Sequence, residues 1–318
     1  MIASVRSPLI SAAISTQVFP WRAIALSWIK CSEVLIMPDL KEHIATPFLR
    51  RFVPSYRFIR LQESTIDRNH DLQPELNGTS IKVLNWNIAK KNYDQLWVRD
   101  FLALIEQYKP DLIFLQEFSL KMEAEHAVNP LEMSWTFAPN FIDTHHQTYS
   151  GVLTAAKISP LARKSLLTKH HEPLIKTPKV SLITEYPLSN KKETLLTINS
   201  HLINFVDLKK FRTQLQELEV ALSKHQGPII FSGDFNTWSR KRAAILELAA
   251  TRLGLTPVAF APHESKKIKR FLLSPPLDYI FYRGLSEKKA SAKVLDHISS
   301  SDHKPLLAEF SYTDTQEK

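Results

Sequence analysis

Residues 227–238, GPIIFSGDFNTW, constrain the fold more than any other part of the chain. A Gly-Pro pair precedes consecutive bulky apolar residues, and Gly233 ends the apolar run. Such a run between Gly and Pro is typical of a strand that is buried on both faces. Asp234 and Asn236 follow, and side chains two positions apart in extended chain point to the same side. The alternative interpretation is an ordinary turn, since both residue types are common in turns.

Further strands and helices are expected along the chain. Apolar runs predict strands over 81–88, 112–115, 152–156, 180–186, 194–199, 277–282 and 306–310, and helical periodicity predicts helices over 93–108, 208–222 and 240–253. The polar segment 140–149 predicts a loop. This pattern indicates one α/β domain over 81–311, after an N-terminal extension and linker over 1–80 and before a polar tail over 312–318.

Polar side chains recur where the predicted strands end. These are Asn87, Glu117, His201, Asp278 and the pair Asp302-His303. Each has a structural explanation as a turn residue, a surface acid or a buried histidine. Together they favour a cleft at the sheet edge, because grouping polar side chains in a cleft costs desolvation that folding alone does not require.

The chemistry that suits this set is hydrolysis of a phosphate ester. Glu117 and Asn87 supply hard oxygen ligands for Mg²⁺ or Mn²⁺. A carboxylate such as Asp234 can orient an attacking water, while histidines and amides neutralise charge on the phosphate oxygens. Cys31 is the only cysteine, which excludes a cysteine-rich zinc site and favours a reducing compartment.

The motifs LNWNI, LQE, SGV, NSHL, SGDFN, LDYI and SDH occur in this order between residues 80 and 311. In that order they resemble the endonuclease/exonuclease/phosphatase superfamily, which includes DNase I, inositol polyphosphate 5-phosphatases and neutral sphingomyelinases. The resemblance implies a DNase I-like four-layer α/β sandwich, with two mixed β-sheets flanked by helices. The longer stretches GDFNTWSR and PLDYIFYRGL resemble the bacterial YafD-type subfamily, which starts near Met37 and is thought to be cytoplasmic.

The same resemblance implies a role for each site residue. Glu117 is expected to be the main metal ligand, with Asn87 beside it and Asp302 near the metal. Asp234 is expected to activate water, while Asn236 and His201 contact the phosphate. His303 is expected to stabilise the transition state, oriented by Asp278.

The charge of the chain favours a polyanionic partner. The formal net charge is +9, which suits nucleic acid, a phosphorylated ligand or an acidic membrane. Basic residues just beyond the motifs are expected to contact phosphates of a nucleic acid, namely Lys90, Lys91, Arg240, Lys241, Arg242 and Lys304. The plainer interpretation is solvated surface charge. The leading hypothesis is therefore a Mg²⁺-dependent nuclease; the alternatives are a phosphatase or phospholipid phosphodiesterase, and an inactive phosphate-binding module.

The N-terminal stretch between Pro8 and Met37 is largely apolar. Pro20, Arg22 and Lys30 divide it into pieces too short to span a bilayer. One interpretation, the less favoured, is that this stretch contacts a membrane surface. The other is that translation begins at Met37.

Overall fold

The computed structural model describes residues 53–70, 73–122, 132–173, 175–189 and 192–312. The predictions for the stretch before Met37 and for the tail beyond Tyr312 lie outside these residues. Among the helices that are described, none combines the length and apolar character needed to cross a membrane.

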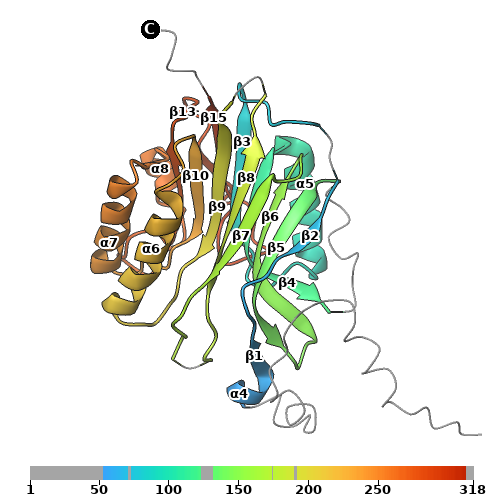
Figure 1. Cartoon of the computed structure of the whole chain (residues 1–318), viewed down its shortest axis with the longest axis vertical. Coiled ribbons are helices and arrows are strands. Elements are labelled where there is room, and N and C mark those ends of the chain that lie inside the picture. Colours follow the sequence, from blue (N-terminus) through green and yellow to red (C-terminus); the bar gives the residue numbers. More distant parts are fainter. Residues whose placement is uncertain (1–52, 71–72, 123–131, 174, 190–191, 313–318) are drawn as a thin grey trace, which may run out of the picture. The chain divides into compact units, whose positions relative to one another are not determined.

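Two mixed β-sheets form the centre of the molecule (Figure 1). The larger sheet runs β1–β5–β6–β4–β3–β15–β13, with β2 beside β5 and β14 beside β15. Its strands are β1 (Phe58–Arg60), β2 (Ile66–Arg68), β3 (Ile81–Asn87), β4 (Leu112–Lys121), β5 (Ser134–Asp143), β6 (Thr148–Ala156), β13 (Ser286–Glu287), β14 (Lys293–Val294) and β15 (Leu306–Ser311). The smaller sheet runs β11–β12–β10–β9–β8–β7, with β7 (Ala162–Leu167), β8 (Val180–Pro187), β9 (Thr194–His201), β10 (Ile229–Asp234), β11 (Thr256–Pro257) and β12 (Asp278–Arg283). Only β3 with β4 and β9 with β10 are parallel among these pairs.

Three long helices cover the outer faces of the sheets (Figure 1): α5 (Gln95–Tyr108) the larger sheet, and α6 (Leu208–Leu222) and α7 (Arg240–Arg252) the smaller one. Two short helices, α4 (Pro54–Arg57) and α8 (Pro262–Ser265), lie next to β1 and β14. The three long helices begin where a capping side chain accepts a hydrogen bond from a free backbone N–H: Asp94 for α5, Asp207 for α6 and Ser239 for α7.

Three layers of apolar side chains hold these elements together. On the larger sheet, Trp97 of α5 stacks between Trp86 and Phe101. Between the two sheets lie side chains such as Phe114 and Ile230. A third cluster packs α6 and α7 on the smaller sheet. The order helix, sheet, sheet, helix confirms the predicted four-layer sandwich.

The prediction of a loop over 140–149 is wrong. Strands β5 and β6 occupy most of this segment and pair in antiparallel fashion up to Asp143 and Thr148. Its polar side chains bond to distant parts of the chain, because Asp143 accepts hydrogen bonds from Arg57 and Asn140 donates one to the carbonyl of Pro178. The larger sheet also begins before residue 81, since β1 and β2 pair with β5.

Strand register brings distant polar residues to one edge. Asp234 at the end of β10 lies beside His201 on one side and Asp278 on the other. Gly233 permits the close approach of β9, because its φ is +152° and a Cβ atom there would overlap the carbonyl oxygen of Ser200. The predicted strand end therefore forms the meeting point of three strands.

Candidate active site

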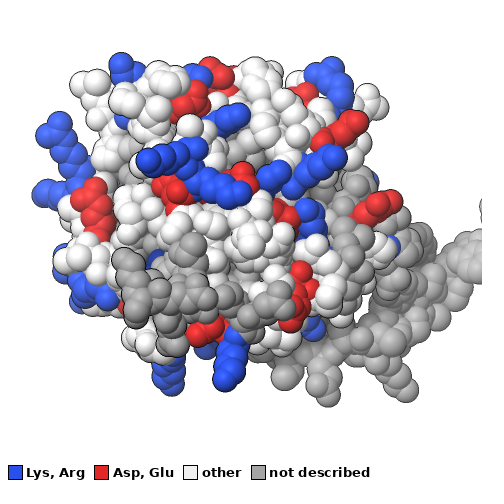
Figure 2. All heavy atoms as spheres, turned by 90° about the horizontal axis from the view of Figure 1, so that it is seen from above, with Lys and Arg blue, Asp and Glu red and all other residues white. Residues whose placement is uncertain are grey.

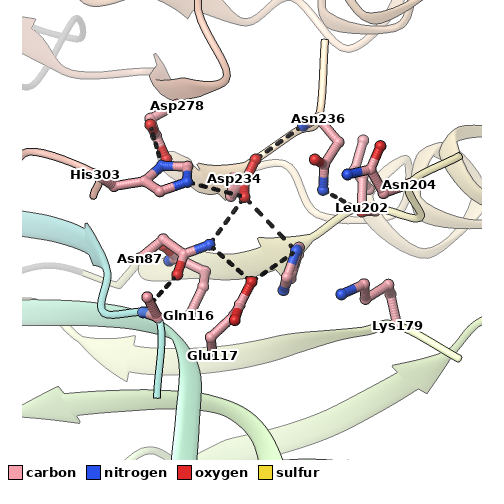
Figure 3. A network of polar contacts seen from close by, with 12 residues as sticks. Asn87, Gln116, Glu117, Lys179, Leu202, Asn204, Asp234, Asn236, Asp278 and His303 are labelled. Atoms are coloured by element: carbon pink, nitrogen blue, oxygen red, sulfur yellow. Dashed lines mark hydrogen bonds and ion pairs between the residues drawn. The ribbon is translucent and has the colours of Figure 1, made fainter. Parts of the chain in front are cut away.

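A cleft of about 250 Å³ opens at this edge. Its lining includes Glu117, His201, Asp234, Asn236, Asp302 and His303. Asn87 and Asp278 lie directly behind it, where they bind Asp234 and His303. The structure thus brings together all the residues for which the resemblance implies a metal or catalytic role. Figure 3 labels most of them, namely Asn87, Glu117, Asp234, Asn236, Asp278 and His303.

Asp234 lies at the centre of the polar network (Figure 3). One carboxylate oxygen, Oδ2, accepts a hydrogen bond from Asn87 Nδ2 at 2.9 Å, and the other accepts one from the backbone N–H of Asn236 at 3.0 Å. Oδ2 also lies 3.6 Å from His201 Nε2 and 3.9 Å from His303 Nε2. Burial raises the pKa of Asp234, and the neighbouring Asp278 carboxylate adds to this effect.

His303 is held by a hydrogen bond of 2.8 Å between its Nδ1 and Asp278 Oδ2. Trp86 Nε1 donates to the backbone carbonyl of His303, which fixes the main chain. Burial opposes protonation, but the charges of Asp278 and Asp234 and the hydrogen bond to Asp278 raise the pKa of His303 above its usual value. The imidazolium therefore carries its charge into the cleft through Nε2.

Glu117 occupies an irregular position within β4 rather than the end of a strand. The pairing register of β4 with β6 shifts between Leu115 and Phe118, and Glu117 has a φ of +53°. This bulge directs the carboxylate into the cleft, where Oε1 lies 3.5 Å from Asn87 Nδ2 and 4.0 Å from His201 Nε2. About a third of the side chain (32%) is exposed.

His201 and Asn236 occupy the wall beside Asp234. Burial lowers the pKa of His201 well below its usual value, and the charges of Lys179, His303 and Lys90 lower it further, so the ring is neutral. Asn236 Nδ2 donates to the carbonyl of Leu202 at 2.8 Å. This bond fixes the amide at the cleft surface.

The site has the composition of a metal centre. Asp234, Asp278 and His303 are buried, and each offers one ligand atom within 4.8 Å of the others. Asp278 Oδ1 is buried and accepts no hydrogen bond from the described residues. Glu117 and Asn87 add further oxygen atoms next to this group. The carboxylate and amide oxygens of this set fit a hard divalent cation.

Comparison with known proteins identifies the family. The family model described as "Endonuclease/Exonuclease/phosphatase family" matches residues 84–303. The chain belongs to this family. A UPF0294 protein of Vibrio campbellii is 34% identical over 263 residues, which cover 80% of this chain and 84% of that protein. Its name does not confirm the YafD-type subfamily.

Solved structures share the fold of the endonuclease/exonuclease/phosphatase family at low identity. A family member from Beutenbergia cavernae superposes with a TM-score of 0.59 at 14% identity, over 74% of this chain and 72% of that chain. D. rerio TDP2 complexed with a single-strand DNA product gives a TM-score of 0.51 at 18% identity, over 73% and 99%. At such identities the likeness shows the fold alone.

Arg242 does not have the phosphate-contact role predicted for it. Its side chain is fully buried, with the guanidinium 3.9 Å above the ring of Phe211 and 5.2 Å from that of Trp238. It donates hydrogen bonds to the carbonyls of Ile203 and Val206. A phosphate has no access to this group, so the prediction was wrong and the residue stabilises the 202–206 loop.

The other predicted basic contacts separate into two groups. Lys90 lines the cleft. Lys91, Arg240 and Lys241 are exposed outside the cleft lining, and Lys304 Nζ donates to the carbonyl of Ile298. Positive charge is also present elsewhere: Figure 2 shows Lys and Arg among Asp and Glu at the end of the molecule that is uppermost in Figure 1. The net charge therefore does not identify a single polyanion-binding face.

Several residues of the cleft lie outside the sequence motifs and were not predicted. Lys179 Nζ lies 3.4 Å from Glu172 Oε1, which also accepts a hydrogen bond from the backbone N–H of Asn204 at 3.1 Å. Lys269 Nζ donates a hydrogen bond to Asp302 Oδ2 at 3.1 Å, and both residues line the cleft. These residues come from irregular segments, whose positions follow from tertiary packing rather than from periodicity.

A network of buried amides forms the floor beneath the site. Gln116 Nε2 donates to Asn85 Oδ1 at 2.9 Å within the larger sheet and to Asn199 Oδ1 at 2.8 Å in the smaller sheet. Asn199 Nδ2 returns hydrogen bonds to the carbonyls of Leu115 and Leu153. The two sheets are thus joined by directional bonds next to Glu117 and His201.

Proposed function

We propose that the chain is a Mg²⁺- or Mn²⁺-dependent phosphodiesterase that hydrolyses a phosphate ester by direct attack of water. The observation that carries this proposal is the convergence of a buried carboxylate, two imidazoles and two amides around one cleft. Within the endonuclease/exonuclease/phosphatase family this set suits charge neutralisation at phosphorus.

Each polar residue of the cleft has its own role in this hydrolysis. Asp234 orients the water and accepts its proton, since its position is fixed by the donors Asn87 and Asn236. His303 faces the developing negative charge from Nε2, and Asp278 orients it from Nδ1. His201 and Asn236 contact the non-bridging phosphate oxygens.

The cation would be held by Glu117 and Asn87, with Asp302 nearby. It would supply charge stabilisation to the phosphate and the leaving oxygen. Asn87 would coordinate through its amide oxygen, which now accepts the backbone N–H of Ala89 at 3.0 Å. We likewise propose a cytoplasmic location and membership of the YafD-type subfamily.

Nucleic acid is the first candidate substrate. Lys90 in the cleft supports it, and so does the single-strand DNA product complexed with D. rerio TDP2, a protein that shares the fold. The support from the other basic residues is weaker, because they lie outside the cleft lining. A phospholipid is the second candidate, and it is favoured by exposed apolar side chains at the cleft mouth, Phe205 and Phe271.

A substrate panel tests the proposal. Purified protein is assayed with Mg²⁺, with Mn²⁺ and with EDTA on bis(4-nitrophenyl) phosphate, DNA, RNA, a phosphoinositide and sphingomyelin. We expect metal-dependent hydrolysis of at least one diester, and a loss of kcat by about 100-fold or more in D234N and H303A at unchanged melting temperature. Binding of these compounds without any turnover would instead identify an inactive phosphate-binding module.

A further inference from the structure

Two leucines project into solvent at the mouth of the cleft. Leu272 and Leu273 are 96% and 97% exposed, the highest values among the large apolar side chains that the structure describes. Phe271 next to them is 48% exposed. Consecutive exposed apolar residues are uncommon on a monomer surface and mark contact with a partner.

The loop that carries them is a defined turn. The backbone N–H of Ser274 donates to the carbonyl of Phe271 at 2.8 Å, and the N–H of Phe271 donates to Ser274 Oγ at 2.9 Å. Leu272 has a φ of +50°, which places it at the tip. The N–H of Leu277 donates to the carbonyl of Lys269 at 2.9 Å and closes the loop at its base. The two leucines are therefore held outward by the fold.

The loop is continuous with the catalytic cleft. Phe271 and Leu277 line the same cleft as Asp234 and His303. Phe205, which is 65% exposed, also lines it and comes from the loop after β9. Two separate segments therefore place apolar side chains around one opening.

Basic residues flank both apolar segments. Lys266, Lys267, Lys269 and Arg270 precede Phe271, and Lys209 and Lys210 follow Phe205. Four acids pair with three of these six cations: Glu264 and Asp296 with Lys267, Asp302 with Lys269, and Asp207 with Lys210. An apolar tip surrounded by cations complements an anionic lipid surface, where aliphatic side chains enter the acyl boundary and lysines meet headgroup phosphates.

We propose that the 271–274 loop docks the protein on an anionic phospholipid bilayer, with Leu272 and Leu273 inserted and the cleft facing the headgroups. Adjacent aliphatic tips suit this partner better than a single-stranded nucleic acid, which is held by aromatic stacking. The docking itself needs no catalysis. The further inference that the substrate is a headgroup phosphodiester rests on the proposed function.

Vesicle binding tests the docking. The full chain is sedimented in EDTA with phosphatidylcholine vesicles that contain phosphatidylglycerol, and with vesicles of phosphatidylcholine alone. We expect binding to the anionic vesicles that weakens with salt, and a loss of at least about tenfold in L272S/L273S. The control V220S/L248S removes two apolar side chains that are 70% and 56% exposed on α6 and α7, and it should bind like the wild type.

The outcomes are separable. Equal vesicle binding by L272S/L273S and wild type would overturn the docking proposal. A matching loss of affinity for a single-stranded oligonucleotide, with vesicle binding unchanged, would also overturn it and assign the loop to nucleic acid. Hydrolysis of bis(4-nitrophenyl) phosphate should be unaffected in L272S/L273S. Failure of the wild type to hydrolyse any diester would refute the proposed function while leaving the vesicle result intact.

Discussion

Glu117 adopts a backbone conformation that costs about 1 kcal/mol or more for a residue with a side chain. The surrounding strands β4 and β6 impose it, and the result is a carboxylate that leaves the plane of the sheet and enters the cleft. The position therefore combines local strain with a partly exposed carboxylate next to Asn87 and His201.

The variant E117Q tests this residue as a metal ligand. Glutamine keeps the shape but removes the charge, so we expect weaker Mg²⁺ binding and a fall in turnover by about 100-fold, partly recovered at high Mg²⁺. Calorimetric titration and initial rates measure both. E106Q, an exposed change on α5, should behave as the wild type. Normal rates for E117Q in limiting Mg²⁺ would remove Glu117 from the metal site.

Asp143 links the acid stability of the protein to one ion pair. Burial alone would favour the neutral form, but hydrogen bonds from Arg57 and His146 lower the pKa of Asp143 to about 2. The folded-state pKa is thus below the unfolded value, so the contribution is complete above about pH 4 and is lost as the pH falls toward 2.

We expect D143N to lower the free energy of unfolding by about 1 kcal/mol at pH 7, after allowance for solvent screening. The difference from wild type should shrink as the pH falls from about 4 to 2, which urea unfolding at several pH values measures. R57Q should give a similar loss, and the double variant little more. A difference that is constant with pH would contradict the ionic origin.

At the scale of elements, the sequence predicted best where one strand or helix explains its own pattern. The run before Gly233 and the stripe of α6 form the strand and helix that their periodicity indicates. Asp278 was found at the correct edge, although it begins β12 instead of ending a strand, because β12 runs antiparallel to β10. The bulge at Glu117 and the side chain of Arg242 depend on contacts between elements, which periodicity does not contain.

Arg242 provides a test of an element-level role. Its guanidinium joins the start of α7 to the 202–206 loop, which carries Asn204 and Phe205 into the cleft. We expect R242A to lower the free energy of unfolding by about 3 kcal/mol. The substitution leaves two backbone carbonyls without their donor and creates a cavity where the side chain was buried. K241A, at the exposed neighbouring position, should change it by less than about 0.5 kcal/mol. Unchanged stability with weaker substrate binding in R242A would restore the phosphate-contact role.

Across the whole described region, the three layers of apolar side chains share the two sheets as common walls. The cluster of Phe114 and Ile230 lies between the sheets, while those of Trp97 and Phe211 lie outside them. Loss of one cluster therefore exposes a face of a sheet that supports the next. Such sharing favours a single cooperative unfolding transition.

We expect F211A, in the outer cluster of the smaller sheet, to lower the free energy of unfolding by about 3–5 kcal/mol. The tryptophan fluorescence, to which Trp86 and Trp97 of the other side contribute, should shift to the same midpoint as the far-UV circular dichroism. Two separated midpoints in either protein would show that the sheets unfold independently.

The buried amides of Asn85, Gln116 and Asn199 have a consequence for recombination between relatives. Each bond between the sheets has one donor and one acceptor, so sliding one sheet by a residue would strand several polar groups in the interior. A chimera that takes its two sheets from different parents would therefore leave buried amides without hydrogen-bond partners, unless Asn85, Gln116 and Asn199 all come from the same parent.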